Sequence, residues 1–423
     1  MLLSHKQRSD RFLLVLLVML LANFANSQVA KKKVVFVIAD GIPADIIERV
    51  AKPHMDLIIQ AGAYKRAYVG GIKGTYNQTP TISAPGYNNL LTGVWADKHN
   101  VFNNDIKAPN YHYWSIFRYL KNQQPSLKTA VFSSWIDNRT KLVGEGLPET
   151  GGYKVDYAFD GYELDTLRFP HDKKGEYLHQ IDLQVVHKAD SVIRKSAPDL
   201  SWIYLEYTDE VGHIYGNGAI MDQAVNYLDE QMGSIYSAIE YRKKNFGEDW
   251  LLVITTDHGR DAKNGMNHGG QSDRERTTWL VTNYPKLNEY FKQFNPAIVD
   301  ILPSITSFMQ LEMPKENQEE LDGVSMIGKV SLANARASVK NDSLWVSWNS
   351  FEKESKLKIS ITYTDAFKKG AVDVYTYVTT VPIADNAVVI PINKLLSGKA
   401  KILLEAKHNK VNTVVSLPEK NNR

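Results

Sequence analysis

Short apolar runs rich in β-branched residues alternate with longer amphipathic stretches between residues 34 and 282, and this alternation limits the possible folds more than any other property of the sequence. Five runs predict strands, at Val34–Ile38, Thr129–Ser133, Trp202–Leu205, Trp250–Thr255 and Trp279–Thr282. These runs are apolar on both faces, which is typical of buried parallel strands. Helix-like stretches between them, such as 183–195 and 221–244, predict an α/β/α sandwich with a mostly parallel central sheet.

The pattern changes near residue 325, after which we find no convincing helix. Seven strand-like runs follow, at Ser331–Val339, Ser343–Trp348, Leu357–Thr364, Val372–Val381, Ala387–Ile392, Ala400–Ala406 and Thr413–Leu417. Short strands separated by turn residues predict a small immunoglobulin- or fibronectin-like β-sandwich. We therefore expect an α/β domain over residues 28–329 and an all-β domain over residues 330–423. The second domain has no cluster of catalytic residue types, and its role stays open.

The N-terminus has the features of a targeting segment. Positive charges at Lys6, Arg8 and Arg11 precede an apolar run at 12–21, and small residues follow at 25–27. This arrangement predicts a signal peptide over residues 1–27 with cleavage before residue 28; an uncleaved anchor helix is the alternative. No other stretch has the length of a membrane helix, so we expect no stable membrane span after cleavage.

Composition excludes several classes of protein. The 423 residues include no cysteine, which removes disulfides, thiolate catalysis, zinc fingers and iron–sulfur clusters. A secreted chain without disulfides fits a bacterial periplasm or secreted bacterial protein. The formal net charge is only +3 and no long Lys/Arg block occurs, so a nucleic-acid polymer is not an expected partner.

Four short segments carry the residues that can do chemistry, and three of them lie at or just after the end of a predicted strand. They contribute Asp40, then Asp209 with His213, then Asp257 with His258, and finally His268 in a glycine-rich loop. A spacing of four residues places Asp209 and His213 on one side of a helical turn. Mixed carboxylate and imidazole ligation suits zinc and, less specifically, other transition metals. Each segment alone reads as a turn or a surface pair, but their joint occurrence predicts a metal centre.

The order of these segments resembles the alkaline phosphatase superfamily, and more narrowly its type I phosphodiesterase/nucleotide pyrophosphatase family, over residues 32–329. The resemblance implies an alkaline-phosphatase-like catalytic domain with two Zn²⁺ ions, although other divalent transition metals also suit the ligands. One ion would be held by Asp209, His213 and His268. The other would be held by Asp40, Asp257 and His258, and the oxygen of the nucleophile would lie between the two ions.

The segment at 79–93, TPTISAPGYNNLLTG, resembles the nucleophile segment of that family, Pro-Thr-x-Thr/Ser-x-Pro ahead of a Thr-Gly helix end. The match implies that Ser83 supplies the attacking oxygen and is itself a metal ligand, while Thr81 is the alternative nucleophile. An ordinary helix N-cap is the alternative role for Ser83, and the two roles are compatible. In KHNVFNND, at 98–105, Asn104 aligns with a family residue whose amide would donate to a phosphoryl oxygen. A polar turn is the alternative there.

The stretch SWIDNR at 134–139 bears on the kind of ester. Monoesterases of the superfamily with a threonine nucleophile carry Lys-Asp-Arg at this place, whereas this chain has no lysine there. Trp135 instead resembles the aromatic position of the diesterase branch, although Arg139 remains a candidate cation for a monoester. Trp135 and Tyr207 are candidate walls for a second ester group or a nucleobase, with core packing as an equally weighted alternative.

The sequence therefore predicts a secreted phosphodiesterase or nucleotide pyrophosphatase that acts on a small-molecule phosphate ester through a covalent phospho-Ser83 intermediate. Three alternatives stay open: a phosphomonoesterase of the same superfamily, a sulfatase, and a secreted binding protein without catalysis. The sulfatase signature is matched only in part, because Tyr87 stands where an arginine is required. The individual substrate and the oligomeric state are not predicted.

Overall fold

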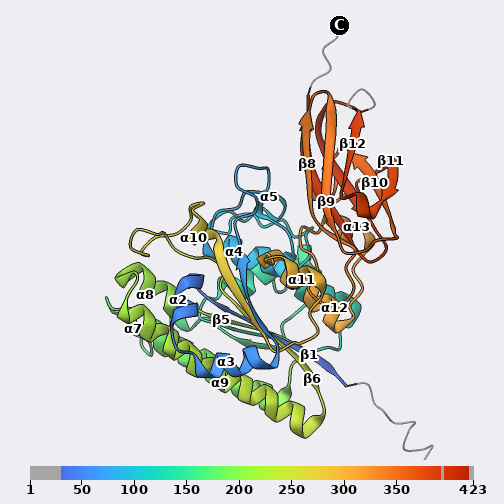
Figure 1. The fold of residues 1–423 in the computed structure, drawn as a ribbon. Helices are drawn as coiled ribbons and strands as arrows, with labels where there is room; N and C mark the ends of the chain where they lie inside the picture. Colours follow the sequence, from blue (N-terminus) through green and yellow to red (C-terminus); the bar gives the residue numbers. More distant parts are fainter. Residues whose placement is uncertain (1–29, 392–394, 419–423) are drawn as a thin grey trace, which may run out of the picture.

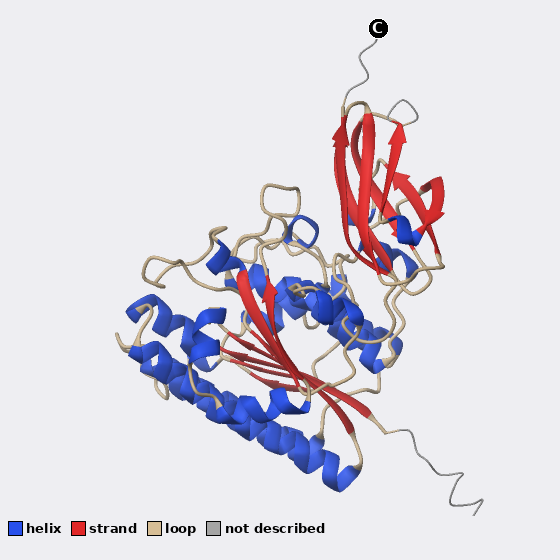
Figure 2. Cartoon of the chain, viewed as in Figure 1, coloured by secondary structure: helices blue, strands red, loops and turns tan. Residues whose placement is uncertain are grey.

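The computed structural model describes residues 30–391 and 395–418, which form an α/β part and a smaller all-β part (Figures 1 and 2). A seven-stranded sheet in the order β2-β7-β6-β1-β5-β3-β4 runs through the α/β part. Its strands are β1 (Lys32–Ala39), β2 (Ala63–Tyr68), β3 (Thr129–Ser133), β4 (Tyr157–Phe159), β5 (Leu200–Leu205), β6 (Asp249–Thr255) and β7 (Thr277–Thr282). All five predicted strands of this domain are present, and β2 and β4 are additional edge strands.

The centre of the sheet is parallel, whereas one side is not. Strand β1 pairs in parallel with β5 and β6, and β3 pairs in parallel with β5 and β4. Strand β7 runs antiparallel to both β6 and β2, so the expectation of a parallel strand at 279–282 was wrong. The physical reason is the connection: the loop after β6 returns to the sheet at the edge it left, and an antiparallel neighbour needs no crossover helix.

Helices cover both faces of this sheet (Figure 1). Alternate residues of β1 point to opposite cores: Val35 and Val37 join one apolar cluster, and Val34 and Phe36 join the other. The first face is covered by α2 (Ala44–Arg49), α3 (Pro53–Ala61), α7 (Glu176–Ser196), α8 (Tyr207–Tyr215) and α9 (Ala219–Phe246). The second is covered by α4 (Ser83–Thr92), α6 (Ile116–Gln123) and α12 (Ile301–Met309). Four further short α-helices among the described residues are α5 (Ala96–His99), α10 (Asp273–Arg276), α11 (Glu289–Gln293) and α13 (Lys315–Glu320).

The C-terminal part consists of two antiparallel sheets, with the orders β11-β10-β13-β14 and β12-β9-β8. The strands are β8 (Leu332–Lys340), β9 (Ser343–Ser350), β10 (Lys356–Thr362), β11 (Thr376–Pro382), β12 (Ala387–Pro391), β13 (Gly398–Glu405) and β14 (Lys410–Leu417). Trp348 is buried between the sheets, and its indole N–H donates to the Ile383 carbonyl at 2.8 Å. The predicted fold class, an α/β/α sandwich followed by a small all-β sandwich, is confirmed.

Buried ion pairs join the two parts. The ammonium of Lys401, on β13, contacts the carboxylate of Glu320, in α13, and Asp373 at 2.6 Å. The ammonium of Lys98 donates to Asp322 at 2.7 Å and to Asn412 of β14 at 3.1 Å. Each of the two lysines thus lies between groups of the α/β part and groups of the sandwich.

Two expectations concern the membrane. The predicted signal peptide at 1–27 lies outside the described residues. Among the helices that the structure describes, none combines the length and the apolar character needed to cross a lipid bilayer.

Candidate metal centre

The six predicted ligands converge at the carboxyl ends of the parallel strands. They arrive from the end of β1, from α8 after β5, and from the long loop after β6. They form two groups whose candidate ligand atoms lie within 4.8 Å of one another. We call Asp40, Asp257 and His258 the inner group, because all three are buried, and Asp209, His213 and His268 the outer group.

The inner group has atoms that lack partners where a cation would be held. His258 Nε2 lies 3.3 Å from Asp40 Oδ1 and 3.3 Å from Asp257 Oδ2. Each of these three buried atoms is without a hydrogen-bond partner in the described part of the chain. Unpaired polar atoms in a protein interior are costly, and a divalent cation among them would remove that cost. The inner group therefore fits a metal ion.

The pKa shifts of the inner group also indicate a site for a cation. Burial, followed by the Asp209 carboxylate, raises the pKa of Asp40 to about 7. Burial and then the Asp40 carboxylate raise the pKa of Asp257 well above its usual range. Burial and the neighbouring His268 ring lower the pKa of His258 well below its usual range. A bound divalent cation would offset these costs, since it stabilises carboxylates and binds the neutral imidazole.

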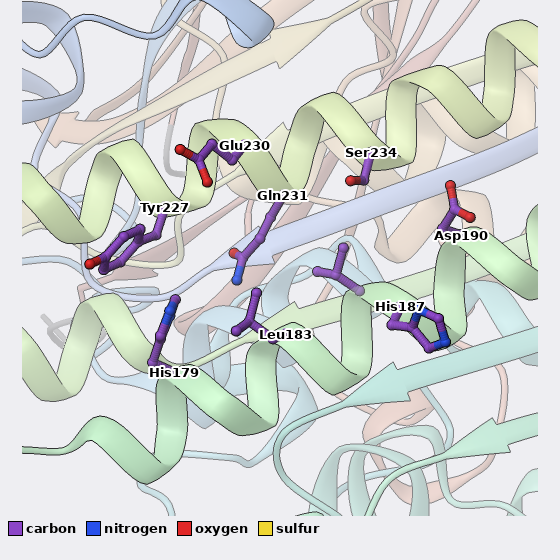
Figure 3. A pocket seen from close by; sticks show the side chains of 9 residues that line it. His179, Leu183, His187, Asp190, Tyr227, Glu230, Gln231 and Ser234 are labelled. Atoms are coloured by element: carbon purple, nitrogen blue, oxygen red, sulfur yellow. The ribbon is translucent and has the colours of Figure 1, made fainter.

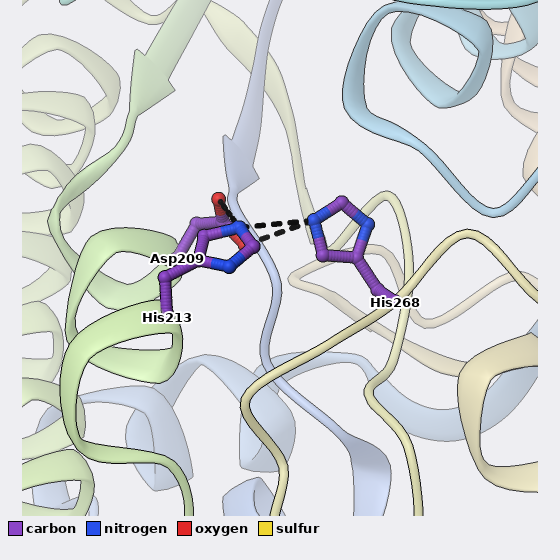
Figure 4. Close-up of side chains that lie close together, drawn as sticks. All are labelled: Asp209, His213 and His268. Carbon is purple, nitrogen blue, oxygen red and sulfur yellow. Dashed lines mark hydrogen bonds and ion pairs between the residues drawn. The ribbon is translucent and has the colours of Figure 1, made fainter.

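The outer group is more open and is shown in Figure 4. His213 Nε2 lies 3.2 Å from Asp209 Oδ2 and 3.1 Å from His268 Nε2. The side chain of His213 is 42% exposed, so a ligand can approach from solvent. Helix α8 supplies both Asp209 and His213 one turn apart, as the spacing predicts.

All three imidazoles are oriented by backbone carbonyls. The Nδ1 atoms of His213, His258 and His268 lie 3.0, 2.9 and 3.0 Å from the carbonyl oxygens of Met266, Gly259 and Thr81, respectively. An Nδ1–H that donates to a carbonyl leaves Nε2 free as a metal ligand, and such contacts fix the ring orientation.

The two groups adjoin each other. The His258 and His268 rings stack with their centroids 3.8 Å apart, and His258 Nε2 lies 3.9 Å from Asp209 Oδ1. Two cations held by these groups would therefore be close neighbours, the arrangement of two-metal hydrolases.

Helix α4 begins beside this centre, and Ser83 is its first residue. Two residues earlier, the Thr81 carbonyl contacts His268 Nδ1. Three residues later, a Cβ added at Gly86 would lie 2.8 Å from Asp257 Cβ, so only glycine permits this approach. The turn that carries Ser83 is thus held between the outer and the inner group. The N-cap is Ile82, whose side chain makes no capping hydrogen bond, so Ser83 does not serve as an N-cap.

The residues Thr79, Thr81 and Ser83 each carry a hydroxyl, and two of these hydroxyls form hydrogen bonds within the protein. Thr81 Oγ1 donates to the Gly270 carbonyl at 2.9 Å and accepts from the Gly269 N–H. Thr79 Oγ1 accepts from the Ala96 N–H at 3.1 Å. Among these three residues, Ser83 alone has a hydroxyl without a protein partner in the described structure.

Asn104 lies next to the same helix N-terminus. Its Oδ1 accepts a hydrogen bond from the Ala84 N–H at 3.0 Å. With Oδ1 held in this way, the Nδ2 group remains available as a donor beside Ser83.

The predicted aromatic walls are placed differently from each other. Trp135 is half-buried and makes an edge contact with Tyr87, with ring centroids 6.4 Å apart. Tyr207 is 9% exposed and packs against His179 and Tyr227, on the α7–α9 side of α8. Core packing accounts for Tyr207. Trp135 instead contacts Tyr87, and the Tyr87 hydroxyl donates to Asp40 of the inner group.

Three residues of the centre were not among the predicted site residues. Tyr87 and Tyr204 both donate to Asp40 Oδ2, the latter at 2.8 Å, and Arg260 donates to Asp209. One signal was available: Tyr87 follows Ser83 by four residues, so helical spacing places both on one side of α4. Nothing in the sequence marked Tyr204 or Arg260, because their roles depend on contacts between distant segments.

A further hollow lies away from the metal centre. A cavity of about 540 Å³ lies between α7 and α9, with His179, His187 and Tyr227 in its wall (Figure 3). No residue of the inner or outer group lines this cavity. It is therefore separate from the candidate metal centre.

Two curated proteins are similar to this chain in sequence. The chain is 22% identical over 322 residues to human ectonucleotide pyrophosphatase/phosphodiesterase family member 5, covering 73% of this chain and 63% of that protein. It is 32% identical over 139 residues to a 2,3-bisphosphoglycerate-independent phosphoglycerate mutase of Mycoplasma mycoides, covering 33% and 25%. The chain thus spans 63% and 25% of the lengths of these two curated relatives, respectively.

Solved structures also match this chain. A putative sulfatase from Bacteroides thetaiotaomicron has a TM-score of 0.52 at 11% identity, covering 86% of each chain. Murine ectonucleotide pyrophosphatase/phosphodiesterase 5 in complex with AMP has a TM-score of 0.48 at 14% identity, covering 67% of this chain and 96% of that one. Residues 34–274 match the family described as type I phosphodiesterase/nucleotide pyrophosphatase. The chain belongs to this family, within the alkaline phosphatase superfamily.

Proposed function

We propose that this protein hydrolyses phosphate diesters or nucleotide pyrophosphates with Ser83 as the nucleophile and two zinc ions as cofactors. The observation that carries the proposal is the position of the Ser83 turn between two groups of three ligands each. A structural role would not require three buried ligand atoms that lack a hydrogen-bond partner in the described part of the chain.

The zinc ions would be held by the inner and the outer group. Carboxylate and imidazole donors in sets of three match zinc sites that keep a position open for substrate. When bound, such ions supply Lewis-acid stabilisation of the serine alkoxide and of the charge that develops on the phosphoryl oxygens.

The residues of the chain would then act as follows. Ser83 Oγ loses its proton and forms a bond to phosphorus, while the bond from phosphorus to the first ester oxygen breaks and that oxygen takes up a proton. Asn104 Nδ2 donates to a non-bridging oxygen, and the N-terminus of α4 favours the negative charge. The oxygen of a water molecule then forms a bond to phosphorus, the bond from phosphorus to Ser83 Oγ breaks, and a proton from that water restores the serine hydroxyl.

The surroundings of Arg139 favour a diester. A monoester brings one more negative charge, which a nearby arginine or lysine would have to meet. Arg139 Nε and Nη2 donate to Asp160 at 2.6 and 2.9 Å, and Nη1 pairs with Glu145. This arginine is thus already neutralised, while Trp135 offers an apolar wall for the second ester group.

The alternatives have less support. A sulfatase would need an arginine where Tyr87 stands, and the Tyr87 hydroxyl contacts Asp40 instead. A binding protein without catalysis would not need the complete set of six ligands. Secretion into the periplasm or medium also remains our proposal, because it depends on the N-terminal 27 residues.

A substrate panel tests the proposed activity. We expect bis(p-nitrophenyl) phosphate to be cleaved with a higher kcat/KM than p-nitrophenyl phosphate, and p-nitrophenyl sulfate to be cleaved least. A chelator should abolish all three activities, and added Zn²⁺ should restore them. A preference for the monoester would overturn the diesterase assignment, and activity that persists in chelator would overturn the metal assignment.

A further inference from the structure

We propose that Arg260 is a positioning residue that holds the ligand-bearing segments together and prepares Asp209 to bind its metal ion. The inference deepens the proposed function and rests on it, because it concerns the same metal centre. Arg260 follows His258 by two residues, and its side chain is completely buried.

The guanidinium reaches the other ligand-bearing segments of the centre. Nε donates to the Gly41 carbonyl, next to Asp40, at 3.0 Å. Nη1 donates to the Gly265 carbonyl at 3.2 Å, in the loop that carries His268. Nη2 donates to the Asp209 carbonyl at 2.6 Å and also contacts the Asp209 carboxylate. One planar side chain therefore links the segments after β1, β5 and β6.

Arg260 contacts only one of the two carboxylate oxygens of Asp209. Arg260 binds Asp209 Oδ1, so that Oδ2 faces His213 Nε2 at 3.2 Å. A carboxylate fixed through one oxygen presents the other in a defined direction, which lowers the conformational cost of metal binding. Arginine suits this role because its charge is permanent and its donors form a rigid fork.

The space for this guanidinium is supplied by glycine. A Cβ added at Gly212, in α8, would lie 2.1 Å from Arg260 Cζ. Gly212 lies within a helix, where alanine is otherwise the better residue. At Gly41 an added Cβ would meet Asp209 Oδ1 at 2.4 Å and Arg260 Nη2 at 3.1 Å. The absence of a side chain at Gly212 thus serves the approach of Arg260.

Metal affinity tests this inference without relying on turnover. Apo-protein is titrated with Co²⁺ and followed by visible absorption, and Zn²⁺ affinity is measured against a chromogenic chelator. The variants are Arg260→Met, Arg260→Lys and Gly212→Ala. The control is Arg274→Met. Arg274 lies nearby in α10 and donates to Asp45, to Asn217, to the Asp261 carbonyl and, at 3.4 Å, to the Arg260 carbonyl, but to none of the six candidate ligands.

We expect Arg260→Met to lower the affinity for one of the two metal ions by roughly 10–100-fold. Effects of this size are seen when groups that orient metal ligands are removed. Gly212→Ala should lower the affinity for the same metal ion, although alanine favours the helix. The affinity of Arg260→Lys should lie between those of Arg260→Met and the wild type. The control should stay within about threefold of the wild type.

Two other results would be informative. Unchanged affinity for both equivalents in folded Arg260→Met, or in Gly212→Ala if the former does not fold, would overturn the role of Arg260. A wild-type protein that takes up no Co²⁺ or Zn²⁺ would instead contradict the proposed function, and the inference with it.

Discussion

Replacement of Ser83 by alanine is expected to lower phosphodiester turnover by roughly 10⁴-fold or more, because nucleophile removal leaves only binding and electrostatic stabilisation. The metal content should stay unchanged, since all six Asp and His ligands remain in place. Steady-state kinetics with bis(p-nitrophenyl) phosphate and metal analysis of the same sample measure the two quantities.

Ser83→Thr is the matched variant, because it keeps a hydroxyl at the same backbone position. It should retain measurable turnover, and acid-quenched wild-type enzyme should carry its phosphoryl adduct on the peptide that contains Ser83. Turnover that survives Ser83→Ala but is lost in Thr81→Val would assign the nucleophile to Thr81 instead.

Replacement of Lys401 by methionine is expected to destabilise the protein by about 3–5 kcal/mol, the cost of leaving buried charges without their partner. The side chains of Lys401, Glu320 and Asp373 are 5%, 3% and 3% exposed, and the ammonium is the shared partner of both carboxylates. Unfolding in urea, followed by circular dichroism, measures the change in the free energy of unfolding.

Lys358→Met is the control for that experiment. Lys358 also pairs with a carboxylate, that of Glu405 on the neighbouring strand of the same sheet, but its side chain is 52% exposed. Exposed pairs contribute little, so we expect a loss below about 1 kcal/mol. Equal effects of the two substitutions would contradict the assignment of Lys401 to a buried network.

The Lys401 network also bears on the site. Glu320 precedes Asp322 and Gly323, whose N–H groups donate to the Gly93 carbonyl at 3.0 and 3.1 Å. Gly93 ends the helix that begins with Ser83, and it adopts a left-handed conformation with φ of 68°. The β-sandwich thus supports the segment that contacts the C-terminal end of α4.

Much of the fold could be predicted because burial leaves a clear pattern. Residues 129–133 form β3 with the bounds that the apolar run predicts, and the long periodic stretches became α7 and α9. The edge strand β2 was missed because its sequence, AYKRAY, is polar and only partly buried. The direction of β7 was misjudged because an apolar run does not reveal which way a strand pairs.

Part of the candidate site could likewise be predicted from the sequence, and part could not. The convergence of the six candidate ligands was predictable, since each stands in a short segment with a recognisable order. The contributions of Tyr204 and Arg260 were not, because each acts on a residue that is distant in sequence and close only in the folded chain. For Tyr207 the sequence left a wall of the site and core packing as equal alternatives, and its ring packs against His179 and Tyr227.

The most direct test of the central claim, a pair of metal ions held by the inner and outer groups, is anomalous diffraction at the zinc edge from crystals of the Zn²⁺-loaded protein. We expect two peaks roughly 4 Å apart, one about 2.0–2.2 Å from ligand atoms of Asp40, Asp257 and His258 and the other equally close to Asp209, His213 and His268. An anomalous map with no peak at either group, or with peaks only elsewhere on the chain, would contradict the account.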